Sequence, residues 1–294
     1  MLKSPASRGV TIVVPVYGDL PSLLDCVESL KRNVSSSHKV IFANDIGPEA
    51  DKIEREITQL IAGYDHFEYH RNEMNLGFLK NCNNAAFELD KTDNDIMLLN
   101  SDTIVTEGFV ERLADVLRED EMIASVSPRS NNATITTIPI SSMSQKGVEP
   151  EESYRLFLKM KEKLPFYNLS PVSHGFCMLI RRAVIKECGL FDEAFGKGYG
   201  EEVDFSMRVK QYGYKSAICN QAFVYHMEAR SFGAEQKKAL VNENEKIVVQ
   251  RYPNYRKLVR DYRIWAEDQE RKARYGAIIA RTYSFLRRLR AIRP

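Results

Sequence analysis

The sequence lacks the features of a disulfide-stabilised, zinc-binding or membrane-spanning protein. Its five cysteines are odd in number and scattered, and no two form a Cys-x-x-Cys pair, so we expect reduced thiols and neither a disulfide framework nor a zinc site. No apolar run reaches the ~18 residues that a membrane span needs, and the N-terminus lacks the charged-then-apolar pattern of a signal peptide. These absences predict a cytosolic protein.

The chain also lacks a strong charge of either sign. Its formal net charge is +2, which gives no reason to expect a nucleic-acid partner. The basic residues are unevenly placed, however, because the segment from Arg271 to the C-terminus contains no acidic residue. With 294 residues, 44% of them hydrophobic, the chain is long enough for one large α/β domain or two small ones.

Apolar runs of strand length alternate with helical patterns along the chain. The spacing predicts strands at residues 10–16, 39–43, 66–70, 95–99, 122–127, 172–180 and 215–225. It predicts helices at 20–33, around 53–61, and at 78–89, 108–118, 152–164, 205–212 and beyond about 252. This alternation favours βαβ units and a mostly parallel sheet that is covered by helices on both faces.

Polar side chains follow several of these strands. Asp45 and Asp102 come after the second and fourth strands, His226 ends the last one, and an acidic cluster spans 201–204. Ligands of open α/β sheets bind at the carboxyl ends of the strands. Taken singly, Asp102 fits a turn, Asp45 a helix cap, the acidic cluster a helix N-terminus and His226 a half-buried core histidine. Their joint placement along one rim favours a ligand site.

Seven short motifs occur in order between about residues 10 and 233. They are Thr11-Ile12-Val13-Val14-Pro15-Val16-Tyr17, Asn44-Asp45, Asn75-Leu76-Gly77-Phe78 with Asn83, Leu98-Leu99-Asn100-Ser101-Asp102, Gly175 to Arg182, Gly189-Leu190-Phe191-Asp192 and Tyr199 to Phe205. In these motifs the chain resembles the family 2 inverting glycosyltransferases of the GT-A fold. Within that family it is most similar to bacterial rhamnosyltransferase-like members that build surface polysaccharides.

The resemblance implies roles for individual residues on the donor side. Pro15 and Tyr17 would line the nucleotide pocket, and Asp45 would accept a hydrogen bond from the base. The matching positions Gly77, Asn83 and Ser101 would also contact the nucleotide sugar, a donor linked to UDP or dTDP.

The resemblance also implies a metal, a base and an acceptor side. Asp102 and His226 would ligate Mn²⁺ or Mg²⁺, which would stabilise the departing diphosphate. Glu202 would be the general base that deprotonates the acceptor hydroxyl. Nearby positions on the acceptor side are His174, Gly175, Glu201 and Asp204.

The motifs depart from the family pattern at some positions. Asn100 replaces the first acidic residue of the metal motif, which leaves one protein carboxylate instead of two. Asn44 replaces the first Asp of the base-binding pair. The base position holds Glu in place of the more usual Asp, so Glu201 and Asp204 remain alternative bases. The Gln-x-x-Arg-Trp motif of processive members is absent, which favours transfer of one sugar at a time.

The resemblance divides the chain into a GT-A domain at 1–250 and a basic, helical extension at 251–294. The nucleotide-binding half would span about 1–128 and the acceptor half about 129–250. The acceptor would be a glycan or a lipid-linked sugar, and the basic extension would contact an anionic membrane at its inner face. A linker to a further module or an oligomer contact is the alternative for this extension.

Two other functions remain open at this stage. A sugar-phosphate nucleotidyltransferase shares the sheet topology, although the segment after the first strand, Val16 to Leu20, offers no glycine-rich basic loop for a triphosphate. A catalytically inactive module that binds a sugar nucleotide or a glycan is favoured by Asn100 but opposed by the presence of Asp102, Glu202 and His226 together.

Overall fold

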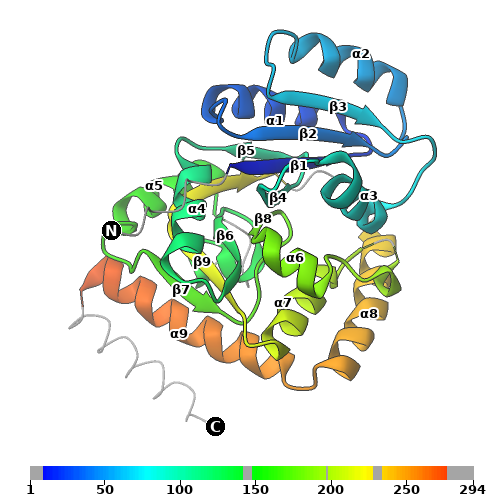
Figure 1. Cartoon of the computed structure of the whole chain (residues 1–294). Coiled ribbons are helices and arrows are strands. Elements are labelled where there is room, and N and C mark those ends of the chain that lie inside the picture. The colour runs from blue at the N-terminus through cyan, green and yellow to red at the C-terminus, as the bar shows by residue number, and fades with distance from the viewer. Residues whose placement is uncertain (1–8, 142–147, 197, 228–233, 277–294) are drawn as a thin grey trace, which may run out of the picture.

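The computed structural model describes residues 9–141, 148–196, 198–227 and 234–276. Strands and helices alternate as the sequence predicts, and Figure 1 shows the helices arranged around a twisted sheet. The strands are β1 (Val10–Val16), β2 (Lys39–Asn44), β3 (Phe67–Arg71), β4 (Asp95–Leu99), β5 (Thr103–Val105), β6 (Ile123–Arg129), β7 (Tyr167–Ser170), β8 (Cys177–Ile180) and β9 (Lys215–His226).

The helices connect and cover these strands. The α-helices are α1 (Leu20–Asn33), α2 (Ala50–Leu60), α3 (Phe78–Asn84), α4 (Phe109–Glu119), α5 (Pro150–Met160), α6 (Arg182–Cys188), α7 (Glu201–Gln211), α8 (Ala234–Arg251) and α9 (Tyr255–Tyr275). A π-helical turn, η1 (Ala85–Leu89), extends α3, and short 3-10 turns lie at η2 (Thr134–Thr136) and η4 (Glu193–Phe195).

The described strands form one sheet in the order β3-β2-β1-β4-β8-β6-β9-β5, and β7 pairs with β9 outside this path. Neighbouring strands from β3 to β4 are parallel. Strand β8 lies antiparallel between β4 and β6, and β6 pairs in parallel with β9. The carboxyl ends of β1, β2, β4, β6 and β9 therefore point the same way, which sets up one functional edge.

Both faces of the sheet are buried, so its central strands are apolar on both sides. Alternate β1 residues such as Ile12 and Val14 pack against α1, α2 and α4 in one cluster. Val13, between them, belongs to the cluster on the opposite face, which contains residues of α3, α6, α7, α8 and α9. The apolar faces of the amphipathic helices thus cover the apolar strands. The mixed α/β, mostly parallel architecture that the sequence predicts is confirmed.

The structure differs from the sequence-based expectations in several places. Helices α6 and α8 were not predicted, and α7 begins at Glu201, four residues before its predicted start. The apolar run 172–180 is not one strand, because only Cys177–Ile180 pairs in the sheet and the residues before it form a turn. The helix expected at 78–89 continues beyond Asn84 as a π-turn. The short strands β5 and β7 were not predicted, since three or four residues carry too little periodicity.

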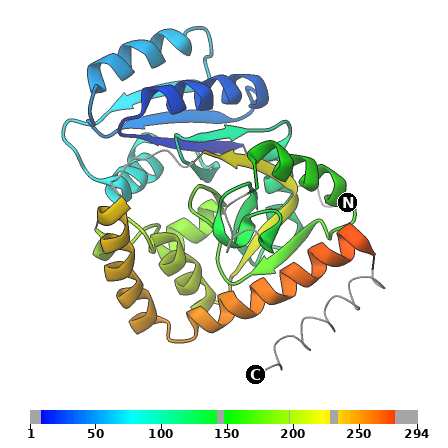
Figure 2. The same ribbon diagram turned by 180° about the vertical axis from the view of Figure 1, so that it is seen from behind.

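The region after residue 250 packs on the rest of the protein. Helix α9 buries Tyr262, Ala266, Glu270 and Ala273, and Figure 2 shows it lying along the sheet beside β7. Arg129 at the end of β6 forms a buried ion pair with Glu270. The basic stretch 277–294 lies outside the described residues, so its predicted membrane contact stays a prediction. No described helix is long and apolar enough to cross a membrane.

Candidate active site

Asp102 and His226 meet at the edge where β4 and β9 end. Thr103 of β5 pairs with His226 of β9, and the Met227 N–H donates to the Asp102 carbonyl oxygen at 3.0 Å. This antiparallel pairing places His226 Nε2 at 3.5 Å from Asp102 Oδ1. Both side chains are only 13% exposed. Two residues that are distant in the sequence therefore face each other.

The His226 ring is oriented by its surroundings. Its Nδ1 lies 2.7 Å from the Asn132 carbonyl oxygen, an acceptor, so Nδ1 carries a proton and the ring turns Nε2 toward Asp102. The Asn131 side chain bonds to both the backbone N–H and the carbonyl oxygen of His226. The Phe176 ring stacks on the imidazole at a centroid distance of 5.2 Å. A metal-binding histidine needs this kind of support, because the second nitrogen fixes the direction of the first.

This pair fits a divalent cation. A carboxylate oxygen and an imidazole nitrogen are both suitable ligands for Mn²⁺, and a carboxylate suits Mg²⁺. Among the described residues no group of three or more His, Cys, Asp or Glu side chains could hold a metal ion. Two protein ligands leave most of the coordination sphere to substrate and water, which is the arrangement expected of a site that holds a diphosphate.

Glu202 lies next to the loop that supports His226. A Cβ placed on Gly175 would lie 3.6–3.9 Å from side-chain carbons of Glu202, so the two residues are in contact distance. In the same loop the His174 ring contacts Phe176, which stacks on His226. Glu202, His174, Gly175 and His226 therefore lie in one region of the structure, and their chemical roles stay predictions.

Serine hydroxyls hold this loop against β6 and α7. The His174 N–H donates to Ser127 Oγ at 2.8 Å, and the Ser173 N–H donates to Ser206 Oγ at 3.1 Å. Ser206 in turn donates to the Glu202 carbonyl oxygen at 2.7 Å. The loop also reaches the metal-side turn, because the Asn100 N–H donates to the Phe176 carbonyl oxygen at 2.8 Å. These bonds fix Glu202 relative to the Asp102 turn.

Burial changes the protonation of the two glutamates that begin α7. Desolvation, followed by the neighbouring charge of Glu202, raises the pKa of Glu201 to about 8. Desolvation also raises the pKa of Glu202, although bonds from backbone N–H groups, including that of Gly200, oppose this effect. Glu201 Oε2 is buried and has no hydrogen-bond partner among the described residues. At neutral pH Glu201 therefore holds a proton, which removes a second negative charge from beside Glu202.

Asp45 organises the turn that follows β3. Its carboxylate accepts bonds from Asn72 Nδ2 at 2.9 Å, from the Leu76 N–H at 2.7 Å and from the Gly77 N–H at 2.8 Å. The Asn75 side chain donates to the Asp45 carbonyl oxygen at 2.7 Å. Asp45 is only 3% exposed. The structure thus gives it a role in shaping the 72–77 turn, and its predicted bond to the base stays a prediction.

The other predicted donor-side residues lie near this turn and near Asp102. Tyr17 is 49% exposed just after β1, whereas Pro15 is half-buried within it. A Cβ on Gly47 would lie 1.3 Å from the Tyr17 carbonyl oxygen, so only glycine allows the residues after Asp45 to approach Tyr17. Ser101 immediately precedes Asp102 in the turn after β4.

The side chains of two predicted site residues, Asn83 and Asp204, bond to other parts of the protein. Asn83 donates to the Phe191 carbonyl oxygen at 2.9 Å and accepts from the Phe191 N–H at 3.1 Å, so both of its polar ends bind backbone. Asp204 is fully buried and bonds to Arg208, Arg251 and Tyr252. In the structure these side chains therefore bond within the protein, and the predicted sugar contact of Asn83 and acceptor-side role of Asp204 stay predictions.

Sequence reasoning missed several residues that shape the site. The Asn132 carbonyl orients His226, and buried Asn81 links the Ala43 carbonyl oxygen to Asn72. Helix α9 reaches the site too, since the Glu202 charge contributes to the raised pKa of Tyr255. The only visible signal was the concentration of asparagines between residues 72 and 84.

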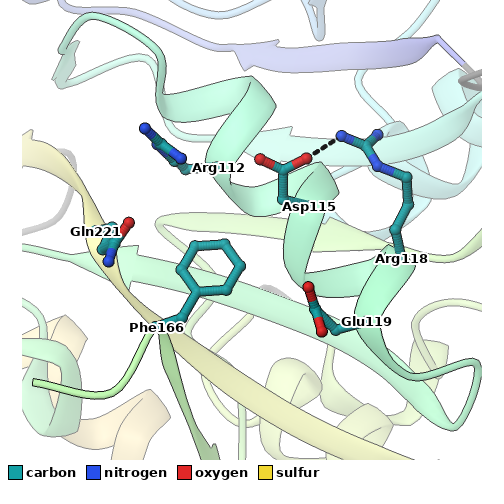
Figure 3. Close-up of a pocket in the computed structure, with 6 residues that line it drawn as sticks. All are labelled: Arg112, Asp115, Arg118, Glu119, Phe166 and Gln221. Atoms are coloured by element: carbon teal, nitrogen blue, oxygen red, sulfur yellow. Dashed lines mark hydrogen bonds and ion pairs between the residues drawn. The ribbon is translucent and has the colours of Figure 1, made fainter.

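Two surface hollows lie away from these residues. One, of about 450 Å³, lies between α4 and β9, and Figure 3 shows Phe166 facing Arg112 and Gln221 there while Asp115 pairs with Arg118. The other, of about 600 Å³, lies between β7 and α9.

Comparisons with known proteins give a consistent result. The family model described as glycosyl transferase family 2 matches residues 11–189. No curated protein matches the chain. The solved structure of GalNAc-T7 with UDP, GalNAc and Mn²⁺ is similar, with a TM-score of 0.59 and 17% identity over 76% of this chain and 44% of that one. The chain thus spans less than half the length of that relative.

A second similar structure covers more of the molecule. It is the mannosyltransferase PcManGT from Pyrobaculum calidifontis in complex with GDP-Man and Mn²⁺, with a TM-score of 0.58 and 12% identity over 98% of this chain and 82% of that one. At these identities the two likenesses establish the fold alone. The family match covers more than half of the chain, and it includes β1 to β4 and the loop beside Glu202.

Proposed function

The chain belongs to glycosyl transferase family 2, and we propose that it transfers one sugar, with inversion, from a nucleoside-diphosphate sugar to an acceptor hydroxyl. The observation that carries this proposal is the junction of Asp102, His226 and Glu202. Asp102 and His226 form a pair suited to a divalent cation. The loop at 174–176 contacts His226 and also Glu202, whose carboxylate is suited to act as a base. One region would thus supply both the metal ligands and the base that the reaction needs.

The donor side would hold the nucleotide diphosphate. Asp102 and His226 would bind Mn²⁺ or Mg²⁺, which supplies Lewis-acid stabilisation of the departing diphosphate. Tyr17, just after β1, and the turn that Asp45 organises would contact the nucleotide. The two similar structures, solved with UDP or GDP-Man and with Mn²⁺, support this assignment. We propose that the nucleoside diphosphate of the donor is UDP or dTDP.

The acceptor side would use Glu202 as its base. Inversion requires that the attacking hydroxyl loses its proton on the face of the sugar opposite the leaving group. A carboxylate whose pKa is raised by burial accepts a proton more readily near neutral pH. Protonated Glu201 keeps this corner from holding two adjacent negative charges. No covalent intermediate is needed.

The acceptor proposed here is a glycan or a lipid-linked sugar used to build a surface polysaccharide. It rests on the rhamnosyltransferase-like motifs in the sequence and on the basic residues after Arg271. Such a segment is attracted to anionic lipid, which would bring a cytoplasmic enzyme to the inner face of the membrane. Non-processive transfer rests on the missing Gln-x-x-Arg-Trp motif.

A nucleotide-sugar screen tests the proposal directly. The full-length protein is incubated with UDP-, dTDP- and GDP-linked sugars, with Mn²⁺, with Mg²⁺ or with EDTA, and released nucleoside diphosphate is measured. Thermal melting with each nucleoside diphosphate is measured in parallel. We expect metal-dependent stabilisation by one class of nucleotide and release of the same diphosphate from its sugar. Stabilisation without release would favour an inactive binding module, and pyrophosphate exchange would favour a nucleotidyltransferase.

A further inference from the structure

A groove between β7 and α9 has the properties of a carbohydrate subsite. It has a volume of about 600 Å³, within the range of pockets that hold small ligands. In Figures 1 and 2 helix α9 runs beside β7 in both views. The groove is lined by Tyr167, Asn168 and Leu169 of β7 and by Asp261, Tyr262 and Trp265 of α9.

The lining combines aromatic faces with amide and carboxylate groups. Trp265 is 42% exposed and its ring lies 5.6 Å from that of Tyr262, so a rigid aromatic surface borders the groove. Sugar rings present C–H faces that pack on aromatic rings and hydroxyls that bond to amide or carboxylate oxygens. Asn168 and Asp261 supply such groups. Aromatic residues of this kind bind ligands with little loss of conformational entropy.

The Tyr262 hydroxyl is a buried polar group in the lining of the groove. The residue is 9% exposed, and the Asn168 side chain is close enough to its Oη to interact with it, although the two groups make no well-aligned hydrogen bond. A buried hydroxyl in this position has lost its bonds to water. A ligand hydroxyl that enters the groove would supply a well-aligned bond to this group.

Two elements lead from the groove to the proposed catalytic residues. Leu169 is five positions before His174, so the chain between them spans at most about 17 Å. Along α9, Tyr262 lies seven positions after Tyr255, which is about 10 Å of helix, and Tyr255 is close enough to Glu202 to sense its charge. An extended oligosaccharide of a few residues can cover either distance.

We propose that this β7–α9 groove binds sugar residues of the acceptor glycan that lie beyond the reacting hydroxyl. The inference rests on the proposed glycosyltransferase function, because it assigns the acceptor a chain of several sugars. The hollow in Figure 3 is a weaker candidate, since its Asp115 and Arg118 already satisfy each other.

Trp265 makes the groove easy to observe, because it is the only tryptophan in the chain. The labelled full-length protein is applied to a microarray of defined bacterial and synthetic oligosaccharides, and each oligosaccharide that binds is then titrated while Trp265 emission is recorded. The variants are Trp265→Ala, Tyr262→Phe and Ile264→Ala. Ile264 is the matched control, since it is 61% exposed on the same helix but does not line the groove.

We expect the wild type to bind one class of oligosaccharide and to change its Trp265 emission on binding. Trp265→Ala should weaken array binding by about tenfold or more, as loss of an aromatic anchor does. Tyr262→Phe should weaken it about three- to tenfold, because only one hydrogen bond is removed. Ile264→Ala should bind as the wild type does, and the melting temperature of each variant shows whether it is folded.

The outcomes separate this inference from the proposed function. Stabilisation by a nucleotide with Mn²⁺ depends on Asp102 and His226, so Trp265→Ala should keep it. If that stabilisation is absent while Trp265-dependent glycan binding is present, the proposed function is wrong but the groove proposal is supported. If no oligosaccharide binds, or if Trp265→Ala binds equally well, the groove proposal is wrong. If Trp265 emission changes with protein concentration and not with added glycan, the groove is a contact between copies of the protein. This result would also overturn the groove proposal.

Discussion

The turn after β2 and the junction around Asp102 both use acidic side chains, but they use them for different purposes. In the β2 turn the carboxylate of Asp45 accepts three bonds from its own chain. In the junction, defined by Asp102, His226 and Glu202, the acidic groups face a histidine, a glycine and a neighbouring glutamate. The first region is held together by its carboxylate, whereas the second is held together by neighbouring groups such as the Ser127 and Ser206 hydroxyls and the Asn131 side chain.

This difference separates structural from chemical roles for residues that look alike in sequence. Asp204, one turn along α7 from Glu201, has its carboxylate fully bonded to Arg208, Arg251 and Tyr252. Glu202, two positions earlier, bonds mainly to the backbone N–H of Gly200. Substitutions in the two regions should therefore affect different measurements, stability in one case and turnover or metal binding in the other.

The largest expected effect is the loss of turnover in Glu202→Gln. An amide cannot accept the hydroxyl proton, so sugar transfer should fall by about 10²- to 10⁴-fold. Thermal stabilisation by the nucleotide with Mn²⁺ should remain, because Asp102 and His226 are unchanged. Glu243→Gln, an exposed change on α8, is the control. Undiminished transfer in Glu202→Gln would move the base role to another residue.

The next effect lies in the β2 turn. Asp45→Ala leaves the N–H groups of Leu76 and Gly77 without their acceptor and should lower the free energy of unfolding by about 2–4 kcal/mol. Urea denaturation measures this change. Asp19→Ala removes an exposed helix cap that bonds to Ser22, and it should cost about 1 kcal/mol or less. Equal losses in the two variants would mean that the buried network of Asp45 has no special stabilising role.

The alternating strands and helices were predictable because each of them buries an apolar face. Direction within the sheet was not, since the run ending in Ile180 is apolar whether the strand is parallel or antiparallel to β4. The bonding partners of polar residues were also hidden. Asn83 meets Phe191 and Asp204 meets Arg251 only after the chain has folded, and their separations in sequence are 108 and 47 residues.

The junction itself was predictable only as a set of strand ends. Asp102 and His226 follow apolar strands, which the sequence shows, and parallel strands bring their ends to one edge. The groups that hold the junction in place could not be predicted from the sequence. The Asn132 carbonyl is a backbone group with no side-chain signature, and β5, which pairs Thr103 with His226, is only three residues long.

A smaller effect is expected for metal binding at the junction. His226→Ala removes one of two protein ligands and should weaken the apparent affinity for Mn²⁺ about 10- to 100-fold in the presence of nucleotide. The change is measured as the Mn²⁺ concentration that gives half-maximal thermal stabilisation. His70→Ala, on β3, is the matched control and should leave this concentration unchanged. The same Mn²⁺ dependence in both variants would exclude His226 as a ligand.

The smallest effect is a pH-dependent change in stability from Glu201. Its pKa is about 8 in the folded protein, compared with an ordinary value of 4.5, so between these pH values the folded protein holds a proton that the unfolded chain has released. Stability should therefore fall as the pH rises from about 4.5 to 8. Glu201→Gln mimics the protonated form and should melt about 2–4 °C above the wild type at pH 8.5, but equally at pH 4.5. A difference in melting temperature that stays constant with pH would show that Glu201 is ionised in the folded protein, and the junction would then hold two adjacent charges instead of one.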